Sequence, residues 1–260
     1  MLEVDVYGSG PPLVLIHGSP ANGKTWKAVG DRLSDRYRVI APTLPDHETN
    51  GGTSPSAIGT RDMAEAVERA IDGEDRPIRL AAHSFGANVA LNIALGGRVA
   101  IDRLVLFEPV TMKVLPVAGE DAAFAAAKST FEGYVERHRQ GDERAVETMI
   151  EFWFGPGAFD HMPEPIQAYL IERTEVNVRD VAANFGESYT LDALRNLSIP
   201  ATVVVGGASP AINRTIVEAL ARSLGNASTE TIDGATHAML VTHPERVADV
   251  IAAPEPLEAT

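Results

Sequence analysis

The sequence lacks several features, and each absence excludes or disfavours a class of site or partner. It contains no cysteine among its 260 residues, which excludes disulfides, thiolate metal sites and a cysteine nucleophile. Its apolar runs are far shorter than the roughly 18 residues of a membrane span, and Glu3 and Asp5 interrupt the opening segment, so we expect no signal peptide. It also lacks clusters of lysine and arginine, and the net charge of −14 disfavours nucleic acid and anionic membrane surfaces as partners. We therefore expect a cytoplasmic protein.

Sequence signals for cofactors are weak as well. No G-x-G-x-x-G follows an apolar run, and we expect no phosphate-binding loop and no nucleotide cofactor. No H-x-x-x-H pair and no carboxylate cluster indicates a metal site. The chain is therefore expected to work on a small-molecule ligand without a cofactor or a metal.

The stretch Ile78 to Ala94 (IRLAAHSFGANVALNIA) joins an apolar run to a helix-like pattern through an abrupt turn at Ser84. The residues two before and two after the serine are small, Ala82 and Gly86. Strand, sharp turn and helix with a serine at the turn is the layout of a nucleophile elbow, which holds the serine hydroxyl clear of the sheet. The short string alone is also compatible with an ordinary serine at a helix start.

Strand-like segments recur along the rest of the chain, separated by segments in which apolar residues have helical spacing. Residues 13–16, 38–41, 103–107 and 201–205 are short, mostly apolar runs, residues 2–7 alternate between apolar and polar, and a last strand is expected near residues 229–232. This alternation predicts an α/β protein with a mostly parallel sheet flanked by helices on both faces. The loop at residues 42–55 is expected to be irregular and to lie at the surface, and the tail from Pro254 is expected to be frayed.

The alternation stops between residues 111 and 195, where no strand pattern occurs. Ten of the aromatic residues lie in this segment, more than a surface loop of this length needs. We interpret residues 111–195 as a helical cap (lid) inserted into a core domain of residues 1–110 and 196–260. The aromatic rings either only hold the cap together or also line a cleft beneath it.

Three landmarks occur in a meaningful order: His17-Gly18 after the second strand-like segment, Ser84 at its turn, and His237 after the last such segment. In this order the chain resembles the α/β-hydrolase fold over roughly residues 2–252. The resemblance implies a catalytic site at the carboxyl ends of the strands, with Ser84 as nucleophile and His237 as its general base. It also implies an oxyanion hole formed by the backbone N–H groups of Ser19 and Phe85.

Six other histidines compete with His237 for the role of base. His17 belongs to the His-Gly turn, which is structural in this family, and His83 is expected to point along the buried strand. The remaining four lie in loops or in the cap without a matching landmark: His47, His138, His161 and His243.

The carboxylate that completes the triad departs from the common family pattern. Most members place an aspartate in the loop that here runs from Gly206 to Ile212, and this loop contains no carboxylate. A minority of relatives carry the acid one strand earlier, where this chain has Glu108. We therefore predict Glu108 as the acid; its alternative role is that of a hinge residue of the cap. Asp233 and Asp46 are weaker candidates, and without any of them the protein is a dyad enzyme or a non-catalytic relative.

The resemblance implies a serine hydrolase that cleaves a small, mainly apolar carboxylic ester or related acyl compound through an acyl-enzyme on Ser84. The same machinery supports carbon–carbon bond hydrolysis, perhydrolysis and lyase chemistry, because the fold does not determine the reaction. A ligand-binding relative without turnover is the alternative from another functional class, and the missing acid in the usual loop favours it.

Overall fold

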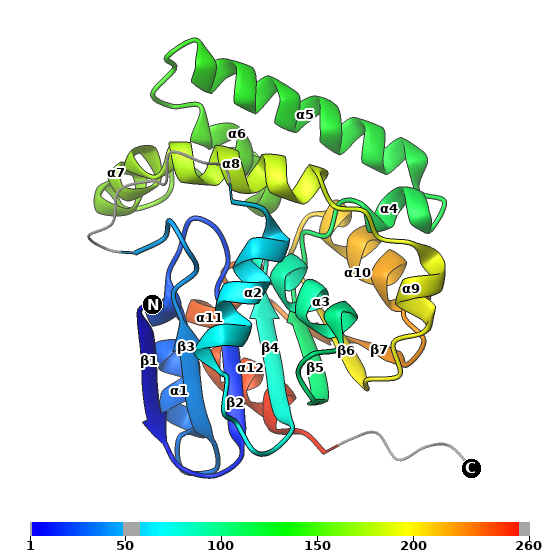
Figure 1. Ribbon diagram of the computed structural model, residues 1–260. Coiled ribbons are helices and arrows are strands. Elements are labelled where there is room, and N and C mark those ends of the chain that lie inside the picture. Colours follow the sequence, from blue (N-terminus) through cyan, green and yellow to red (C-terminus); the bar gives the residue numbers. More distant parts are fainter. Residues whose placement is uncertain (1, 49–57, 255–260) are drawn as a thin grey trace.

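A computed structural model describes residues 2–48 and 58–254 (Figure 1). Its centre is a seven-stranded sheet with the strand order β1-β3-β2-β4-β5-β6-β7. Strand β1 is antiparallel to β3, and all other neighbouring strands are parallel. The strands are β1 (Val4–Gly8), β2 (Pro12–Ile16), β3 (Arg38–Pro42), β4 (Ile78–His83), β5 (Ile101–Phe107), β6 (Ala201–Gly206) and β7 (Ala227–Ile232).

Helices cover both faces of this sheet because successive side chains of each strand point to opposite sides. Leu13 and Leu15 of β2 face one cluster of buried residues, and Val14 and Ile16 face the other. The first face packs against η1 (Gly23–Trp26), α1 (Lys27–Leu33), α11 (Met239–Thr242) and α12 (Pro244–Ala252). The second packs against α2 (Thr60–Ala70), α3 (Gly86–Gly96) and α10 (Ala211–Ser223). The predicted α/β class with a mostly parallel sheet is confirmed.

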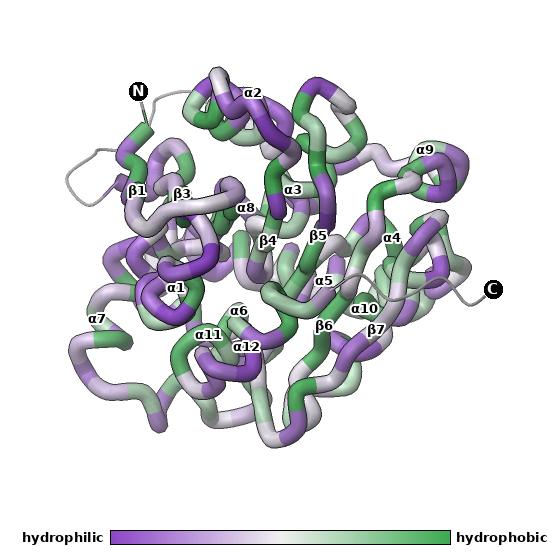
Figure 2. Tube along the Cα trace, turned by 90° about the horizontal axis from the view of Figure 1, so that it is seen from below, coloured by the Kyte–Doolittle hydropathy of each residue, from purple (hydrophilic) through white to green (hydrophobic). Residues whose placement is uncertain are grey.

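Burial agrees with the apolar runs in the sequence. All five residues of β2 and all six of β6 are buried, as expected for strands covered on both faces. Figure 2 shows hydrophobic residues concentrated along the inner strands, while hydrophilic residues recur along the outer helices. The apolar periodicity therefore marks the true core of the molecule.

The loop after β3 is a correction to the sequence analysis. In its described part, Thr43, Leu44 and His47 are buried, whereas this loop was expected to lie at the surface. The reason is tertiary, because a helix between β5 and β6 packs over the loop and bonds to His47. Residues 49–57 of the same loop and the tail at 255–260 lie outside the described residues.

Every regular element between residues 111 and 195 is helical. The helices are α4 (Val114–Val117), α5 (Asp121–Arg139), α6 (Val146–Phe154), α7 (Glu164–Glu172), α8 (Thr174–Phe185) and α9 (Leu191–Arg195). In Figure 1, α5, α6 and α8 lie across the end of the sheet at which β4 and β5 finish. The Phe131 ring, on α5, packs against the rings of Phe152, Trp153 and Phe185, so aromatic contacts join three of these helices.

Close backbone contact forms the turn between β4 and α3. A Cβ atom added to Gly86 would lie 2.4 Å from the carbonyl oxygen of His17 and 2.7 Å from that of Ile16. The first turn of α3 therefore packs directly on the end of β2, and only glycine fits there.

We predict that Gly86→Ala lowers the free energy of unfolding by about 2 kcal/mol or more, because two backbone carbonyls have to move. Gly133→Ala is the control, since nothing lies within 4 Å of a Cβ added to this residue of α5. Alanine favours the helix there by roughly 0.5–1 kcal/mol. Urea unfolding of both variants tests this expectation, and a Gly86→Ala protein as stable as the wild type contradicts it.

Candidate active site

Ser84 lies at the turn between β4 and α3 in a backbone conformation that few non-glycine residues adopt. Its φ is +54°, in the left-handed region that costs free energy for any residue with a Cβ. Its N–H donates to the carbonyl of Phe107, at the end of the neighbouring strand β5, over 3.0 Å. The turn directs the side chain, 7% exposed, into a pocket at the carboxyl end of the sheet.

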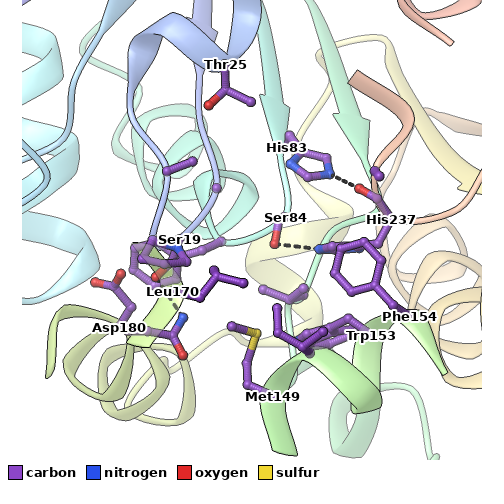
Figure 3. Close-up of a pocket in the computed structure, with 18 of the residues that line it drawn as sticks. Ser19, Thr25, His83, Ser84, Met149, Trp153, Phe154, Leu170, Asp180 and His237 are labelled. Carbon is purple, nitrogen blue, oxygen red and sulfur yellow. Dashed lines mark hydrogen bonds between the residues drawn. The ribbon is translucent and has the colours of Figure 1, made fainter. Parts of the chain in front are cut away.

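His237, in the loop after β7, brings its imidazole to Ser84. Its Nε2 lies 2.9 Å from the hydroxyl oxygen of Ser84 (Figure 3). The indole of Trp153 stacks on the imidazole with ring centroids 5.4 Å apart and planes inclined by 16°. Phe154 meets the same ring edge-on. Two aromatic side chains of α6 therefore cover the imidazole and limit its rotation.

Glu108, directly after β5, contacts the other side of the imidazole. Its Oε2 lies 3.2 Å from Nδ1 of His237, and like Ser84 it has a positive φ, +46°. The Glu108 carboxylate also accepts hydrogen bonds from the N–H of Gly206, the hydroxyl of Ser209 and the amide of Asn213. The loop in which most relatives carry an acid therefore supplies hydrogen-bond donors to an acid from the neighbouring strand.

These contacts determine the charge of Glu108. Burial alone raises the pKa of a carboxyl, but the hydrogen bond and charge of His237, with the donors at Gly206 and Asn213, outweigh it and lower the pKa of Glu108 to about 2. The carboxylate is thus ionised and accepts the Nδ1–H of His237. Nε2 is left to accept the hydroxyl hydrogen of Ser84, as a general base must.

We predict a pH-dependent loss of stability in Glu108→Gln. The pKa of Glu108 is lowered on folding from 4.5 to about 2, so its ionisation stabilises the fold above pH 4.5, and this stabilisation is lost as the pH falls towards 2. Near pH 7 the variant should be less stable than the wild type by on the order of 3 kcal/mol. Near pH 3 the difference should shrink.

Urea titrations at both pH values measure this difference, with Asp233→Asn, at an exposed position, as the control that leaves stability unchanged. A difference between Glu108→Gln and the wild type that stays constant with pH contradicts the assignment of the charge.

The two weaker acid candidates lie elsewhere. Asp233 is exposed, and the carboxylate of Asp46 lies 3.9 Å from the guanidinium of Arg179. Of the carboxylates named in the sequence analysis, Glu108 is the one that the structure brings to His237. Its catalytic role stays a prediction.

His83 differs from the expectation that it points along the strand. Its Nε2–H donates to the backbone carbonyl of His237 over 2.9 Å, and the two rings lie 4.9 Å apart. Burial and the neighbouring His237 lower the pKa of His83 to about 3, so it stays neutral and ties down the loop that carries His237. The position of His83 beside Ser84 was the only sequence signal, and it does not reveal this contact.

His17 has a structural contact, as its place in the His-Gly turn suggested. Nδ1–H donates to the carbonyl of Gly18 over 2.8 Å, and Nε2 accepts the N–H of Leu44 over 2.9 Å. Burial holds the pKa of His17 well below its usual value. The neutral ring therefore joins the loop after β2 to the loop after β3.

His47 forms a buried ion pair that the sequence did not indicate. Its Nε2 lies 3.0 Å from the carboxylate of Asp180 on α8, and its Nδ1 lies 3.0 Å from the carbonyl of Pro45. Burial lowers the pKa of a histidine, but the charge and hydrogen bond of Asp180 and the carbonyl of Pro45 outweigh it, and the pKa of His47 is raised. Residues 133 positions apart in the chain thus join α8 to the loop after β3.

The two backbone groups predicted for the oxyanion hole border the same pocket as Ser84. Ser19 and Phe85 both line it, and within the described ranges neither N–H donates to a protein acceptor. The loop after β2 lies close to Ser84, since a Cβ added to Gly18 would lie 2.8 Å from the Cβ of Ser84. Two unused donors beside the serine are what a developing oxyanion requires.

The sequence does contain a phosphate-loop pattern, although we expected no phosphate-binding loop. Residues 18–25 read GSPANGKT, which matches G-x-x-x-x-G-K-T. The loop does not fit a phosphate, because Pro20 has no N–H and the exposed Lys24 lies 3.8 Å from Glu3. Four N–H groups of the loop are already bonded within the protein: Ala21 to Gly18 O, Gly23 to Thr43 Oγ1, Lys24 to Asn22 Oδ1, and Thr25 to Asn22 O. The match is a coincidence of letters.

The pocket that contains Ser84 and His237 has a volume of about 350 Å³. Its wall is mostly apolar and comes largely from α5 to α8, and among the described residues that line it there is no lysine or arginine. Figure 3 shows Met149, Trp153 and Phe154 lying opposite Ser84. The helical segment therefore does more than hold itself together, because several of its aromatic side chains also line the cleft.

Comparison with known proteins identifies the family. The family model described as "Alpha/beta hydrolase family" matches residues 13–250. The chain belongs to the alpha/beta hydrolase family. This confirms the resemblance drawn from His17-Gly18, Ser84 and His237. No described helix is both long and apolar enough to cross a membrane, and the described residues contain no group of three metal-ligating side chains.

Curated relatives and solved structures within this family include hydrolases and esterases. The chain is 22% identical over 247 residues to the (E)-2-((N-methylformamido)methylene)succinate hydrolase of Acinetobacter baylyi, covering 92% of this chain and 88% of that one. It is 25% identical over 261 residues to the pimeloyl-[acyl-carrier protein] methyl ester esterase of Methylococcus capsulatus, covering 96% of each. A thermophilic esterase from Thermogutta terrifontis superposes with a TM-score of 0.74 at 26% identity, covering 96% of this chain and 91% of that one.

Proposed function

We propose that this protein is a serine hydrolase that cleaves small, uncharged and mainly apolar carboxylic esters. One observation carries the proposal: the imidazole of His237 lies between the hydroxyl of Ser84 (2.9 Å) and the carboxylate of Glu108 (3.2 Å), at the bottom of an apolar pocket. That arrangement is the one that general-base activation of a serine needs. The esterases among its relatives support the same reaction class.

The proposed reaction has two steps. In the first, Ser84 Oγ attacks the ester carbonyl while its proton passes to His237 Nε2; the bond to the alcohol then breaks, and the alcohol leaves with that proton. In the second, water attacks the acyl-enzyme, gives a proton to Nε2 and releases the acid, and the proton returns to Ser84. The ionised Glu108 stabilises the imidazolium in both steps and keeps Nδ1 protonated.

The oxyanion of each tetrahedral intermediate is assigned to the N–H groups of Ser19 and Phe85. Both are unused in the described structure and border the pocket beside Ser84. Phe85 also precedes α3, so the positive end of the helix dipole adds to the stabilisation of a negative oxygen.

The same proposal treats residues 111–195 as a cap over a core of residues 1–110 and 196–260. Three observations support it: the segment is inserted between β5 and β6, its regular elements are all helical, and its side chains form most of the pocket wall. A cap of this kind excludes water, which strengthens every electrostatic contact around the reacting carbonyl.

The pocket favours an uncharged substrate. Its described lining contains no cation, and the one carboxylate in it, Asp180, is already paired with His47. A substrate carboxylate placed there would lose its hydration without gaining a partner, which is costly. The Acinetobacter relative is named for a succinate derivative, and we infer that this chain does not share a dianionic substrate of that kind.

We predict that Ser84→Ala abolishes hydrolysis of p-nitrophenyl butyrate, because it removes the nucleophile. Glu108→Gln should lower kcat by a factor of about 10⁴, and Asp233→Asn should leave kcat at the wild-type value. Steady-state kinetics, with circular dichroism to show that each variant is folded, check this. Substantial turnover by folded Ser84→Ala disproves the proposal.

A matched pair of substrates tests the preference for uncharged esters. Diethyl succinate and monoethyl succinate share one ester group and differ in a negative charge at the far end. We expect kcat/KM for the diester to exceed that for the monoester by about a hundredfold or more, because a few kcal/mol of desolvation is not recovered. Proton release in a pH-stat measures both, and equal values of kcat/KM contradict the inference about charge.

A further inference from the structure

The side chain of Ser19 has a defined hydrogen-bond environment that the proposed mechanism does not use. Its hydroxyl oxygen accepts the Nδ2–H of Asn177, on α8, over 2.9 Å. The other end of that amide, Oδ1, accepts the phenol hydrogen of Tyr134, on α5, over 2.9 Å. Asn177 and Tyr134 are 4% and 0% exposed. A chain of two hydrogen bonds, the first buried and the second partly buried, thus runs from the helical segment to the loop after β2.

This chain of hydrogen bonds has a direction. Because the phenol donates to Oδ1, the amide presents its N–H to Ser19, and the Ser19 oxygen acts as acceptor. The hydroxyl hydrogen of Ser19 then has to point elsewhere. Within residues 2–48 and 58–254 it has no protein acceptor, and Ser19 borders the pocket together with Ser84. A hydroxyl donor is therefore available on the pocket side, next to the Ser19 N–H already assigned to the oxyanion hole.

We propose that the Ser19 hydroxyl is a third donor to the oxyanion, and that Asn177 is the residue that orients it. The inference rests on the proposed function, since it needs an oxyanion formed by attack of Ser84. The donated hydrogen bond strengthens as the carbonyl oxygen gains negative charge, so it acts on the transition state more than on the bound ester.

The arrangement makes the oxyanion hole depend on the helical segment. Besides Asn177, the phenol of Tyr169 on α7 donates to the carbonyl of Pro20 over 2.8 Å, so the two residues of the loop that follow Gly18 are both held from that side. Figure 3 shows Ser19 near Leu170 and Asp180, across the pocket from His237; the dashed line at Ser19 is its hydrogen bond with Asn177. The third donor is in place only when α7 and α8 lie against the core.

Substitution of Ser19 tests the donor directly. We expect Ser19→Ala to lower kcat for p-nitrophenyl butyrate by about a hundredfold, with KM changed by less than about threefold, and Ser19→Thr, which keeps a hydroxyl, to recover most of the loss. Thr174→Val is the control: it removes a buried hydroxyl on α8 that donates to the carbonyl of Leu170, and it should leave kcat unchanged.

Asn177 is tested as a positioning residue through a double-mutant cycle. Tyr134→Phe with Asn177→Leu removes both partners of a buried hydrogen bond together, which leaves no orphaned polar group between them. We expect this pair of changes to lower kcat about tenfold in the wild type and to have no further effect in Ser19→Ala, because the effect passes through the Ser19 hydroxyl. A purely structural role lowers kcat by the same factor in both backgrounds.

A transition-state analogue supplies an independent measurement. A trifluoromethyl ketone adds to Ser84 and places an oxyanion in the hole, so Ser19→Ala should raise its Ki by about the factor by which kcat/KM falls. The inference is overturned when Ser19→Ala keeps kcat and Ki within twofold of the wild type, or when Ser19→Thr restores neither. That result leaves the proposed function intact as long as Ser84→Ala is inactive, whereas an active Ser84→Ala overturns both.

Discussion

The arrangement of the site depends on the two contacts of the His237 imidazole. The imidazole bonds through one nitrogen to Ser84 and through the other to Glu108, and these groups follow β7, β4 and β5 respectively. Because the three strands are parallel, their carboxyl ends reach the same edge of the sheet, and side chains far apart in the chain meet there. Positive φ values at both Ser84 and Glu108 show that the backbone is strained where the two groups are presented, and the packed core of the sheet holds that strain.

The contacts around Glu108 show how this chain accommodates an acid on the neighbouring strand. The end of β6, the loop after it and the first turn of α10 hold the carboxylate with a backbone N–H, a hydroxyl and an amide respectively, so this segment surrounds the acid without carrying it. Across the pocket, helices α7 and α8 bond to Ser19, Pro20 and His47. The pocket at Ser84 is thus bounded by the core on one side and by the helical segment on the other, and its apolar wall is the basis of the proposed preference for uncharged esters.

How much the sequence revealed can be judged from particular residues. Local rules indicated the elbow at Ser84, because small residues two positions away are a steric requirement of the turn, and the order of the three landmarks then favoured Ser84 as nucleophile. Glu108 was predicted from the resemblance, because a minority of relatives carry the acid one strand earlier than usual, and this chain has a glutamate there. His83 and the His47–Asp180 pair were missed, because both depend on partners 154 and 133 residues away. The string GSPANGKT matches a phosphate loop in letters only, since Pro20 has no N–H and four of its backbone donors are used inside the protein.

The sequence by itself determined the alternation of strands and helices, the interruption at residues 111–195, and the sharp turn at Ser84, because periodicity and small-residue constraints act over a few neighbouring positions. The tertiary structure alone decided which carboxylate meets His237, why the loop after β3 is buried, and how the amide of Asn177 presents its N–H to Ser19. These outcomes depend on the register of parallel strands and on helices packed over their ends. Contacts of that kind join residues that are far apart in the chain, so no local sequence pattern reveals them.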